Sequence, residues 1–364
     1  MPGSRKPGPV ERTLREGPVK LTRDGLDLSP GEFARLLDGL QRDRPTEEDS
    51  YSLGGVVGEL EALFARLLGK ERAIFMPTGT LANHLAVRRL CGTDRPRVIV
   101  QQESHLYNDS GDCAQRLSGL HLVPLAPGKP TFTLEEVLQV LSRTAGGRVR
   151  APVGAVVIES PVRRCHNQRF AYEEMQRISS FCRRKGIGLH MDGARLFIES
   201  AFTGVPVRTY ADLFDTVYVS LYKSFNSGSG AVLAGPARLL DGLHHERRMF
   251  GGGLPRAWPF AAVALPYVEG HIERLRRAIR KMQELARDLQ RLGLRIETFP
   301  GGTNVMRMIV ERGNPERLRK ALAKHRVILP RPLRGVPGFL FKVNETLNRD
   351  HAGGLLEIFK TCLR

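Results

Sequence analysis

Long apolar runs are missing from this sequence of 364 residues. No stretch approaches the ~20 consecutive apolar residues that a membrane-spanning helix needs. The N-terminal segment MPGSRKPGPVER is basic and lacks the apolar stretch that a secretory signal carries. Both absences favour a cytoplasmic protein that has no membrane partner.

Cysteine is scarce as well. The number of cysteines is odd and their spacings are wide, so the sequence indicates neither a disulfide framework nor a C-x-x-C metal site. We therefore expect idle, mostly buried thiols and no bound metal. The cysteines are Cys91, Cys113, Cys165, Cys182 and Cys362.

Acidic residues are too few to balance the basic ones. The chain has 56 lysines and arginines against 38 aspartates and glutamates, which gives a formal net charge of +18. Such a charge can attract nucleic acid, or it can belong to a solvated surface. Acids are interleaved with the bases in 273–277 (ERLRR) and 315–320 (PERLRK), and no RNP, zinc-finger or basic-zipper motif is present. We expect a solvated surface and no nucleic-acid partner.

Short β-branched runs alternate with helical patterns through the middle of the chain. This alternation is typical of a mostly parallel, buried sheet with helical crossovers, an α/β architecture. We expect strands at 73–76, 97–101, 120–125, 154–159, 188–191, 216–221 and 231–234. We expect helices at 59–68, 134–142 and 172–185.

The pattern changes after about residue 265. A long charged amphipathic helix is predicted at about 266–292, then strands at 294–298 and 304–309, a helix near 315–325 and a last strand–helix pair. The first 45 residues are rich in proline and charge, with one short helical pattern near 30–41. We therefore predict an N-terminal arm (1–45), a large α/β domain (46–265) and a small C-terminal α+β domain (266–364).

Two polar residues follow successive predicted strands. Asp192 comes after the strand at 188–191, and Lys223 comes after the strand at 216–221. Ligands bind at the carboxyl ends of strands in open α/β sheets, so the two side chains could converge on one ligand. Taken singly, a helix-capping Asp and a surface Lys are ordinary alternatives.

Two further features suit a phosphorylated ligand. Thr78, Gly79 and Thr80 stand at a predicted helix start, where exposed N–H groups and the helix dipole favour a phosphate. A small polar loop, SFNSGSG at 224–230, lets the backbone pass close to a bound group. A Thr-Gly-Thr sequence by itself is often only a helix cap.

These parts together meet the needs of pyridoxal 5'-phosphate. That cofactor requires a lysine joined to its aldehyde carbon, an acid against its pyridine nitrogen and a cup for its phosphate. An acid at the ring nitrogen keeps it protonated, so that the ring withdraws electrons from the substrate. The lysine then serves as a base once the substrate amine has displaced it.

Four segments resemble the threonine aldolases and their β-eliminating-lyase relatives, which are fold-type I pyridoxal-phosphate enzymes. The segments are PTGTLAN at 77–83, HMDGARLF at 190–197, LYKS at 221–224 followed by GAVLAG at 230–235, and FGGG at 250–253. They occur in the family's order, and the likeness covers roughly 45–265 well. The resemblance implies a fold-type I large domain and a homodimer or homotetramer with shared sites.

The resemblance also implies roles for particular residues. Lys223 would hold the cofactor, Asp192 would contact its ring nitrogen and His105 would stack on the ring. Arg195 would bind the substrate carboxylate beside the cofactor. The alternatives are a surface histidine at 105 and a structural ion pair at 195. The implied cofactor-binding residues are Thr78, Gly79, Thr80, His105, Asp192, Arg195, Ser220, Lys223 and Arg256, the last acting either within its own subunit or across a subunit boundary.

The substrate side departs from the family pattern. Val162 occupies the usual position of a histidine that helps to deprotonate the β-hydroxyl, and His166 could compensate only if the loop folds back. Leu340 occupies the position of a second carboxylate-binding arginine. Lys342 would share its strand face, and Arg23 is a further candidate for the carboxylate.

We therefore expect an enzyme that acts on a small amino-acid substrate. The first expectation is cleavage of a β-hydroxy-α-amino acid between Cα and Cβ, giving glycine and an aldehyde. The alternatives are another pyridoxal-phosphate reaction at the same site, such as β-elimination, or a weakly catalytic cofactor-binding protein.

Overall fold

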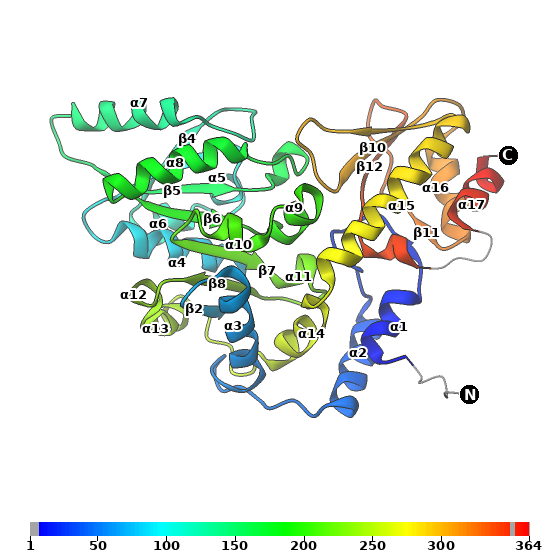
Figure 1. The fold of residues 1–364 in the computed structure, drawn as a ribbon, viewed down its shortest axis with the longest axis horizontal. Helices are drawn as coiled ribbons and strands as arrows, with labels where there is room; N and C mark the ends of the chain where they lie inside the picture. The colour runs from blue at the N-terminus through cyan, green and yellow to red at the C-terminus, as the bar shows by residue number, and fades with distance from the viewer. Residues whose placement is uncertain (1–6, 350–353, 364) are drawn as a thin grey trace. The chain divides into compact units, whose positions relative to one another are not determined.

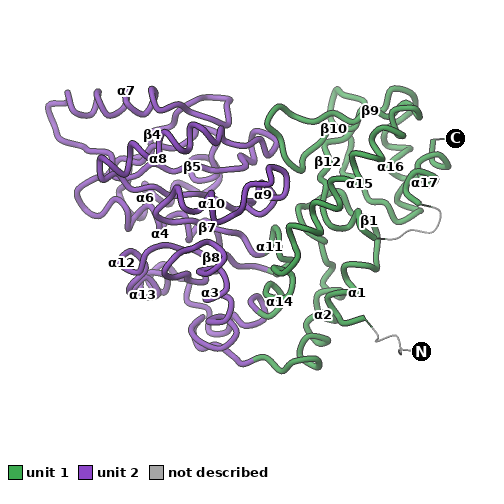
Figure 2. Tube along the Cα trace, in the orientation of Figure 1, with its two compact units in different colours: residues 1–46, 222–228, 262–364 green, residues 47–221, 229–261 purple. Residues whose placement is uncertain are grey.

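The structure, a computed structural model, describes residues 7–349 and 354–363. The chain forms two compact units, coloured separately in Figure 2. Unit 1 comprises residues 1–46, 222–228 and 262–364, and unit 2 comprises 47–221 and 229–261. The short segment that carries Lys223 thus belongs to unit 1, whereas the strand before it belongs to unit 2.

Unit 2 is built on a seven-stranded sheet in the order β2-β8-β7-β6-β5-β3-β4. The pairs β2–β8 and β7–β8 are antiparallel, and the other four pairs are parallel, so the predicted mostly parallel α/β sheet is confirmed. The strands are β2 (Arg72–Met76), β3 (Arg97–Gln101), β4 (His121–Leu125), β5 (Val153–Glu159), β6 (Gly188–Asp192), β7 (Thr216–Ser220) and β8 (Ala231–Gly235).

Every residue of β5, β6, β7 and β8 is buried. This explains why these strands are continuous apolar runs without alternation, since both faces of a parallel sheet are covered by helices. Helix α4 packs against β5 to β8, and α8 packs against β6. Figure 1 shows these two helices on opposite sides of the strands.

The other helices of unit 2 are short or lie at its edges. Thr133 and Glu136 form a capping box that fixes the start of α7, as the Thr-x-x-Glu sequence predicts. The helices wholly within unit 2 are α3 (Gly55–Leu68), α4 (Gly79–Cys91), α5 (His105–Asn108), α6 (Cys113–Ser118), α7 (Leu134–Ala145), α8 (Tyr172–Lys185), α9 (Leu196–Thr203), α10 (Val207–Ala211), α12 (Ala237–Leu240) and α13 (Leu243–Met249), with η1 (Arg163–Cys165).

Unit 1 contains two small sheets. Strands β9 (Leu294–Thr298), β10 (Val305–Val310) and β12 (Gly338–Lys342) form an antiparallel sheet in the order β12-β10-β9. Strand β1 (Val19–Lys20) pairs in parallel with β11 (Val327–Ile328). The helices are α1 (Pro9–Arg15), α2 (Pro30–Asp43), α15 (His271–Arg291), α16 (Pro315–Lys324) and α17 (Gly354–Leu363), with η2 (Glu345–Asn348).

The long helix predicted at 266–292 is two helices, so its predicted start is wrong. Helix α14 (Trp258–Val268) contains Pro266 in its interior, and α15 begins only at His271. Gly270 separates them with φ 69°, a left-handed conformation that favours glycine and interrupts the hydrogen-bond ladder. The sequence places the start too early because proline is common in the first turn of a helix.

Within the described residues, no helix combines the length and the apolar character that a membrane span requires. All five cysteines are among the described residues, and each is a free thiol.

Candidate active site

Asp192 is the last residue of β6 and is 2% exposed. Its Oδ2 accepts a hydrogen bond from Nδ2 of Asn83 at 2.7 Å, and its Oδ1 accepts one from the backbone N–H of Ala194 at 3.2 Å. Helix α9 begins after Arg195, and no side chain caps it, so Asp192 is not a helix cap. A buried carboxylate fixed by two donors at a strand end can face a ligand.

Lys223 lies in α11 (Leu221–Ser224), three residues after the end of β7. It is half-buried, unlike an ordinary surface lysine, and its ammonium lies 5.3 Å from the ring centroid of Tyr222. Lys223 belongs to unit 1 and Asp192 to unit 2. Their convergence on one ligand therefore stays a prediction.

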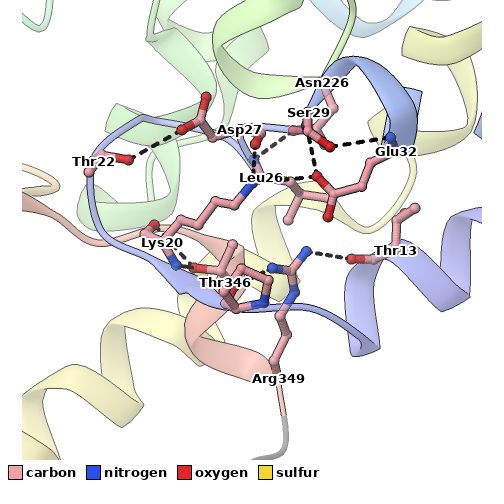
Figure 3. Close-up of polar contacts among 11 residues, drawn as sticks. Thr13, Lys20, Thr22, Leu26, Asp27, Ser29, Glu32, Asn226, Thr346 and Arg349 are labelled. Atoms are coloured by element: carbon pink, nitrogen blue, oxygen red, sulfur yellow. Dashed lines mark hydrogen bonds and ion pairs between the residues drawn. The ribbon is translucent and has the colours of Figure 1, made fainter. Parts of the chain in front are cut away.

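The N-terminal segment passes close to the backbone of Lys223 within unit 1. The backbone N–H of Leu26 donates to Oδ1 of Asn226 at 2.8 Å (Figure 3). A Cβ on Gly25 would lie 2.6 Å from Oδ1 of Asn226 and 3.1 Å from the carbonyl oxygen of Lys223. Only a glycine allows the two segments this close approach.

Polar contacts hold the same N-terminal segment in unit 1. The backbone N–H of Lys20 donates to Oγ1 of Thr346 at 3.0 Å, and Arg349 donates to the carbonyl oxygen of Thr13 at 2.7 Å (Figure 3). Ser29 and Glu32 form a capping box at the start of α2. The segment that contains Arg23 is therefore anchored on both sides.

The sequence predicts a phosphate seat at the start of α4. Oγ1 of Thr78 accepts from the backbone N–H of Leu81 at 3.2 Å and so caps this 13-residue helix. A Cβ on Gly79 would lie 2.0 Å from Oη of Tyr218, so the helix start packs directly on β7. Thr80, the next residue, is half-buried.

Ser220 supplies an unused polar group in the same unit. It shares a face of β7 with Tyr218, because side chains two residues apart in a strand point the same way. Its hydroxyl is buried and has no hydrogen-bond partner among the described residues. A buried hydroxyl without a partner is costly, and a phosphate oxygen would satisfy it. The residues present therefore fit the phosphate of pyridoxal phosphate.

Glu159 ends β5 and lies in register with Asp192 on β6. Its carboxylate accepts from the backbone N–H of His105 at 2.5 Å and from that of Arg163 at 2.9 Å. Burial, followed by the neighbouring Asp192 charge, raises the pKa of Glu159 to about 7. This residue, to which the sequence assigns no role, fixes the backbone at the start of α5 and of the loop after β5.

The other predicted residues of unit 2 lie in different surroundings. Arg195 is 5% exposed and is one of the charges that act on Glu159. Arg256 instead forms an ion pair with Glu48 at 3.1 Å and donates to the carbonyl oxygen of Asp49 at 3.1 Å. Its predicted contact with the cofactor phosphate stays a prediction.

The loop after β5 folds back on itself. The backbone N–H of Val162 donates to the carbonyl oxygen of Gln168 at 2.8 Å, and Asn167 donates to that of Val162 at 3.0 Å. The Val162 side chain is fully buried, whereas His166 is half-buried with φ 53°. The loop therefore closes between 162 and 168, and the replacement of the missing histidine by His166 stays a prediction.

Leu340 and Lys342 share a face of β12, as predicted, because their neighbours on either side are buried and they are not. Nζ of Lys342 forms an ion pair with Oδ1 of Asp24 at 2.9 Å, and Nδ2 of Asn304 donates to the same oxygen at 3.1 Å. The charge of Lys342 is therefore largely compensated. Arg23 is exposed, and no ion pair involves its guanidinium among the described residues.

Arg307, which the sequence argument misses, is the cross-strand partner of Leu340 on β10. Directly opposed residues of antiparallel strands share a face. Arg307 on β10 therefore lies beside Leu340 on β12, the position at which the family pattern has its second arginine. It forms a 3.6 Å ion pair with Glu297. Pairing between distant strands could not be read from residue order alone.

A doubly wound α/β unit with a buried strand-end carboxylate, a capped helix start and a serine without a partner among the described residues is the class of fold and site that suits a phosphorylated ligand. The chain belongs to the beta-eliminating lyase family, whose model matches residues 41–312.

Individual relatives agree with this membership. The chain is 28% identical over 306 residues to the low-specificity L-threonine aldolase of Eremothecium gossypii. The aligned region covers 83% of this chain and 78% of that protein. It is 29% identical over 274 residues to the Saccharomyces cerevisiae enzyme of the same name, covering 74% and 70%. A crystal structure from Listeria monocytogenes, provisionally assigned as an L-allo-threonine aldolase, matches with a TM-score of 0.77, 27% identity and 98% coverage of both chains.

Proposed function

We propose that this protein is a pyridoxal-phosphate-dependent lyase that cleaves a β-hydroxy-α-amino acid to glycine and an aldehyde. The observation that carries the proposal is the buried Asp192 carboxylate, fixed by Asn83 and Ala194 at the end of β6. Such a carboxylate suits a protonated ring nitrogen. Family membership and the names of the relatives, low-specificity L-threonine aldolases, support the choice of reaction.

The cofactor, when bound, supplies an electron-withdrawing ring joined to the substrate nitrogen, which weakens the bonds at the substrate Cα. Asp192 would hold the proton on the ring nitrogen. His105 would cover one ring face, at a height set by the Glu159 bond to its backbone. The phosphate would be held by Thr78, Gly79, Thr80 and Ser220, with Arg256 as a further contact.

Lys223 would join the cofactor covalently and, when free, move a proton through Nζ. A lysine base acts through its neutral amine. Lys223 is half-buried in α11, three residues after the end of β7.

The substrate carboxylate would be bound by Arg195, with Arg23 as the second cation. Arg195 is buried, so its planar fork can be held in one orientation. Arg23 is two residues from Gly25, which packs against the Lys223 carbonyl, and its guanidinium is exposed. Lys342, our other candidate for the second cation at the substrate carboxylate, forms an ion pair with Asp24 and is the weaker choice.

The proton on the β-hydroxyl needs an acceptor other than residue 162. Val162 is apolar and buried and cannot accept a proton. His166 is half-buried in a loop that closes between 162 and 168, so it is the candidate base in that loop. Slow cleavage, or a preference for elimination, would follow if His166 does not reach the substrate.

The experiment is an incubation of purified protein and pyridoxal phosphate with L-threonine, L-allo-threonine, L-serine and L-cysteine in parallel. Acetaldehyde and glycine from either threonine support the proposal. Pyruvate with ammonia from serine or cysteine supports β-elimination instead. Absence of every product, although the cofactor binds, supports a weakly catalytic cofactor-binding protein. Lys223→Ala, which removes the proposed attachment point, is the control and should abolish any product.

We also propose a homodimer or homotetramer in the cytoplasm, with no nucleic-acid partner. Five free thiols suit a reducing compartment. Exposed Tyr51, Leu53 and Met249 in unit 2 suit contact with a second copy. Sedimentation of the purified chain tests the assembly.

A further inference from the structure

His190, a fully buried residue of β6, connects Asp192 to the interior of unit 2 through hydrogen bonds. Its Nδ1 lies 2.8 Å from Oγ1 of Thr216 on β7, and its Nε2 lies 2.9 Å from Oδ1 of Asn83 on α4. Asn83 in turn donates from Nδ2 to Oδ2 of Asp192 at 2.7 Å. The four residues form one chain of contacts, and each is at most 2% exposed.

The chemistry of these groups permits one arrangement of protons when Asp192 is ionised and His190 is neutral. A carboxylate only accepts hydrogen bonds, so the amide NH₂ of Asn83 must face Asp192 and its oxygen must face His190. Nε2 of His190 must then carry the ring proton. Nδ1 has none, so it accepts from the hydroxyl of Thr216.

We propose that Thr216 and His190 are positioning residues that set the orientation of the Asn83 amide and thereby the Asp192 carboxylate. The Thr216 hydroxyl donates to Nδ1 and so satisfies the Nε2–H form of His190, and this N–H opposes a rotation that would turn the Asn83 amide oxygen toward Asp192. The inference rests on the proposed function only where Asp192 meets the cofactor. The proton arrangement itself is a property of the chain alone.

The surroundings of His190 are consistent with a neutral ring. Burial lowers the pKa of His190 to about 4, against the opposing effects of the Asp192 charge and of a hydrogen bond with the backbone of Thr216. An imidazolium would present protons on both nitrogens and would no longer distinguish the two sides of the ring.

The first test uses the protein without cofactor. Nitrogen-15 NMR of histidine-labelled full-length chain at pH 7.5 reports which ring nitrogen carries the proton, and the His190→Phe spectrum assigns the signal. We expect a neutral ring protonated on Nε2. A proton on Nδ1, or a charged ring, overturns the inference whatever the protein catalyses.

The second test uses the protein with pyridoxal phosphate. Thr216→Val keeps the shape of the side chain but removes the hydroxyl that donates to Nδ1, so the Nε2–H form loses this hydrogen bond and His190 can change tautomer. We expect the cofactor dissociation constant to rise about three- to tenfold, the size of effect for one buried hydrogen bond. We also expect a shift in the pH at which the visible absorbance of the bound cofactor changes.

Ser179→Ala is the matched control. The Ser179 hydroxyl is equally buried in unit 2, but it donates to the carbonyl oxygen of Leu213 at 2.6 Å and touches no member of the chain. Equal spectral midpoints in Thr216→Val, His190→Phe and Ser179→Ala would overturn the positioning role. Melting temperatures of all three variants separate this outcome from a folding defect. If the wild type binds no cofactor, the proposed function fails, while the NMR result still decides the proton arrangement.

Discussion

Glu159 accepts the backbone N–H of His105 at 2.5 Å, and the same carboxylate also accepts the N–H of Arg163. One acidic side chain therefore fixes two segments that leave the carboxyl edge of the sheet. One is the start of α5, which carries the proposed ring-stacking histidine. The other is the loop that holds Val162 and His166.

Glu159→Gln should weaken cofactor binding without unfolding the protein. The amide has one acceptor oxygen, so its NH₂ faces one of the two backbone donors, and either His105 or Arg163 loses its partner. An unpaired buried donor costs about 1–3 kcal/mol, and we expect a roughly tenfold weaker affinity for pyridoxal phosphate by titration. Glu103→Gln is the control, because the Glu103 carboxylate also accepts a backbone hydrogen bond, from the N–H of Gly128 at 3.1 Å. Equal affinities in the two variants would contradict the role of Glu159.

Arg23→Ala and Lys342→Met should separate substrate binding from stability. Removal of the exposed Arg23 guanidinium should raise KM for threonine about tenfold and leave the melting temperature nearly unchanged, because it removes a charge-assisted hydrogen bond to substrate.

Lys342→Met leaves Asp24 with Asn304 as a remaining donor. We expect it to lower the free energy of unfolding by about 1–3 kcal/mol.

Steady-state kinetics and chemical unfolding of both variants check this division. A raised KM in Lys342→Met at unchanged stability, with no effect in Arg23→Ala, would reverse our assignment of the second carboxylate cation.

Much of the sheet could be predicted because its strands are buried on both faces. The predicted bounds of β3 agree with the structure, and those of β6 and β7 differ from it by one residue. β3 and β7 are rich in β-branched residues, which favour strands. The predicted start of the long helix is wrong because the conformation of Gly270 is a backbone property that a helical pattern does not reveal.

The contacts of the site were harder to predict than its residues. Asp192 and Lys223 stand out because each follows a strand, whereas the partnership of Asn83 with Asp192 joins residues 109 positions apart. Lys342 could be placed on a strand face from its spacing, yet its ion pair with Asp24 depends on tertiary packing. Periodicity gives the direction of a side chain, and only the packed fold gives its partner.

Gly25→Ala should disturb the loop that carries Lys223. The added Cβ would meet Oδ1 of Asn226 at 2.6 Å, so the N-terminal segment or the loop must shift. We expect cofactor affinity to fall several-fold. Asn226 has φ 57°, so Asn226→Gly keeps that left-handed conformation while it removes the obstructing side chain.

The double variant Gly25→Ala/Asn226→Gly should therefore recover part of the affinity that Gly25→Ala loses. Fluorescence titration with pyridoxal phosphate compares the single and double variants. If the double variant instead loses the sum of the two single-variant losses in cofactor affinity, the contact between residues 25 and 226 does not explain the effect of Gly25→Ala.

Glu199 should make the protein less stable as the pH rises. Burial raises the pKa of Glu199 from 4.5 to about 7, while the Ser160 hydroxyl donates to its carboxylate at 2.6 Å. Between pH 4.5 and 7 the folded state keeps a proton that the unfolded state has lost, so the free energy of unfolding falls across this window. Glutamine cannot ionise, and its oxygen can still accept from Ser160.

Glu199→Gln should therefore gain stability over the wild type on going from pH 5 to pH 8, by up to about 3 kcal/mol. Burial also raises the pKa values of Glu61 and Glu159 to about 7. These two residues lower the stability of the wild type and of Glu199→Gln equally as the pH rises, so they do not affect the difference in stability between the two proteins. Urea unfolding at both pH values measures the effect, with the exposed Glu173→Gln as control. A difference between Glu199→Gln and wild type that stays constant or shrinks as the pH rises would show that Glu199 is already ionised in the folded state at pH 5.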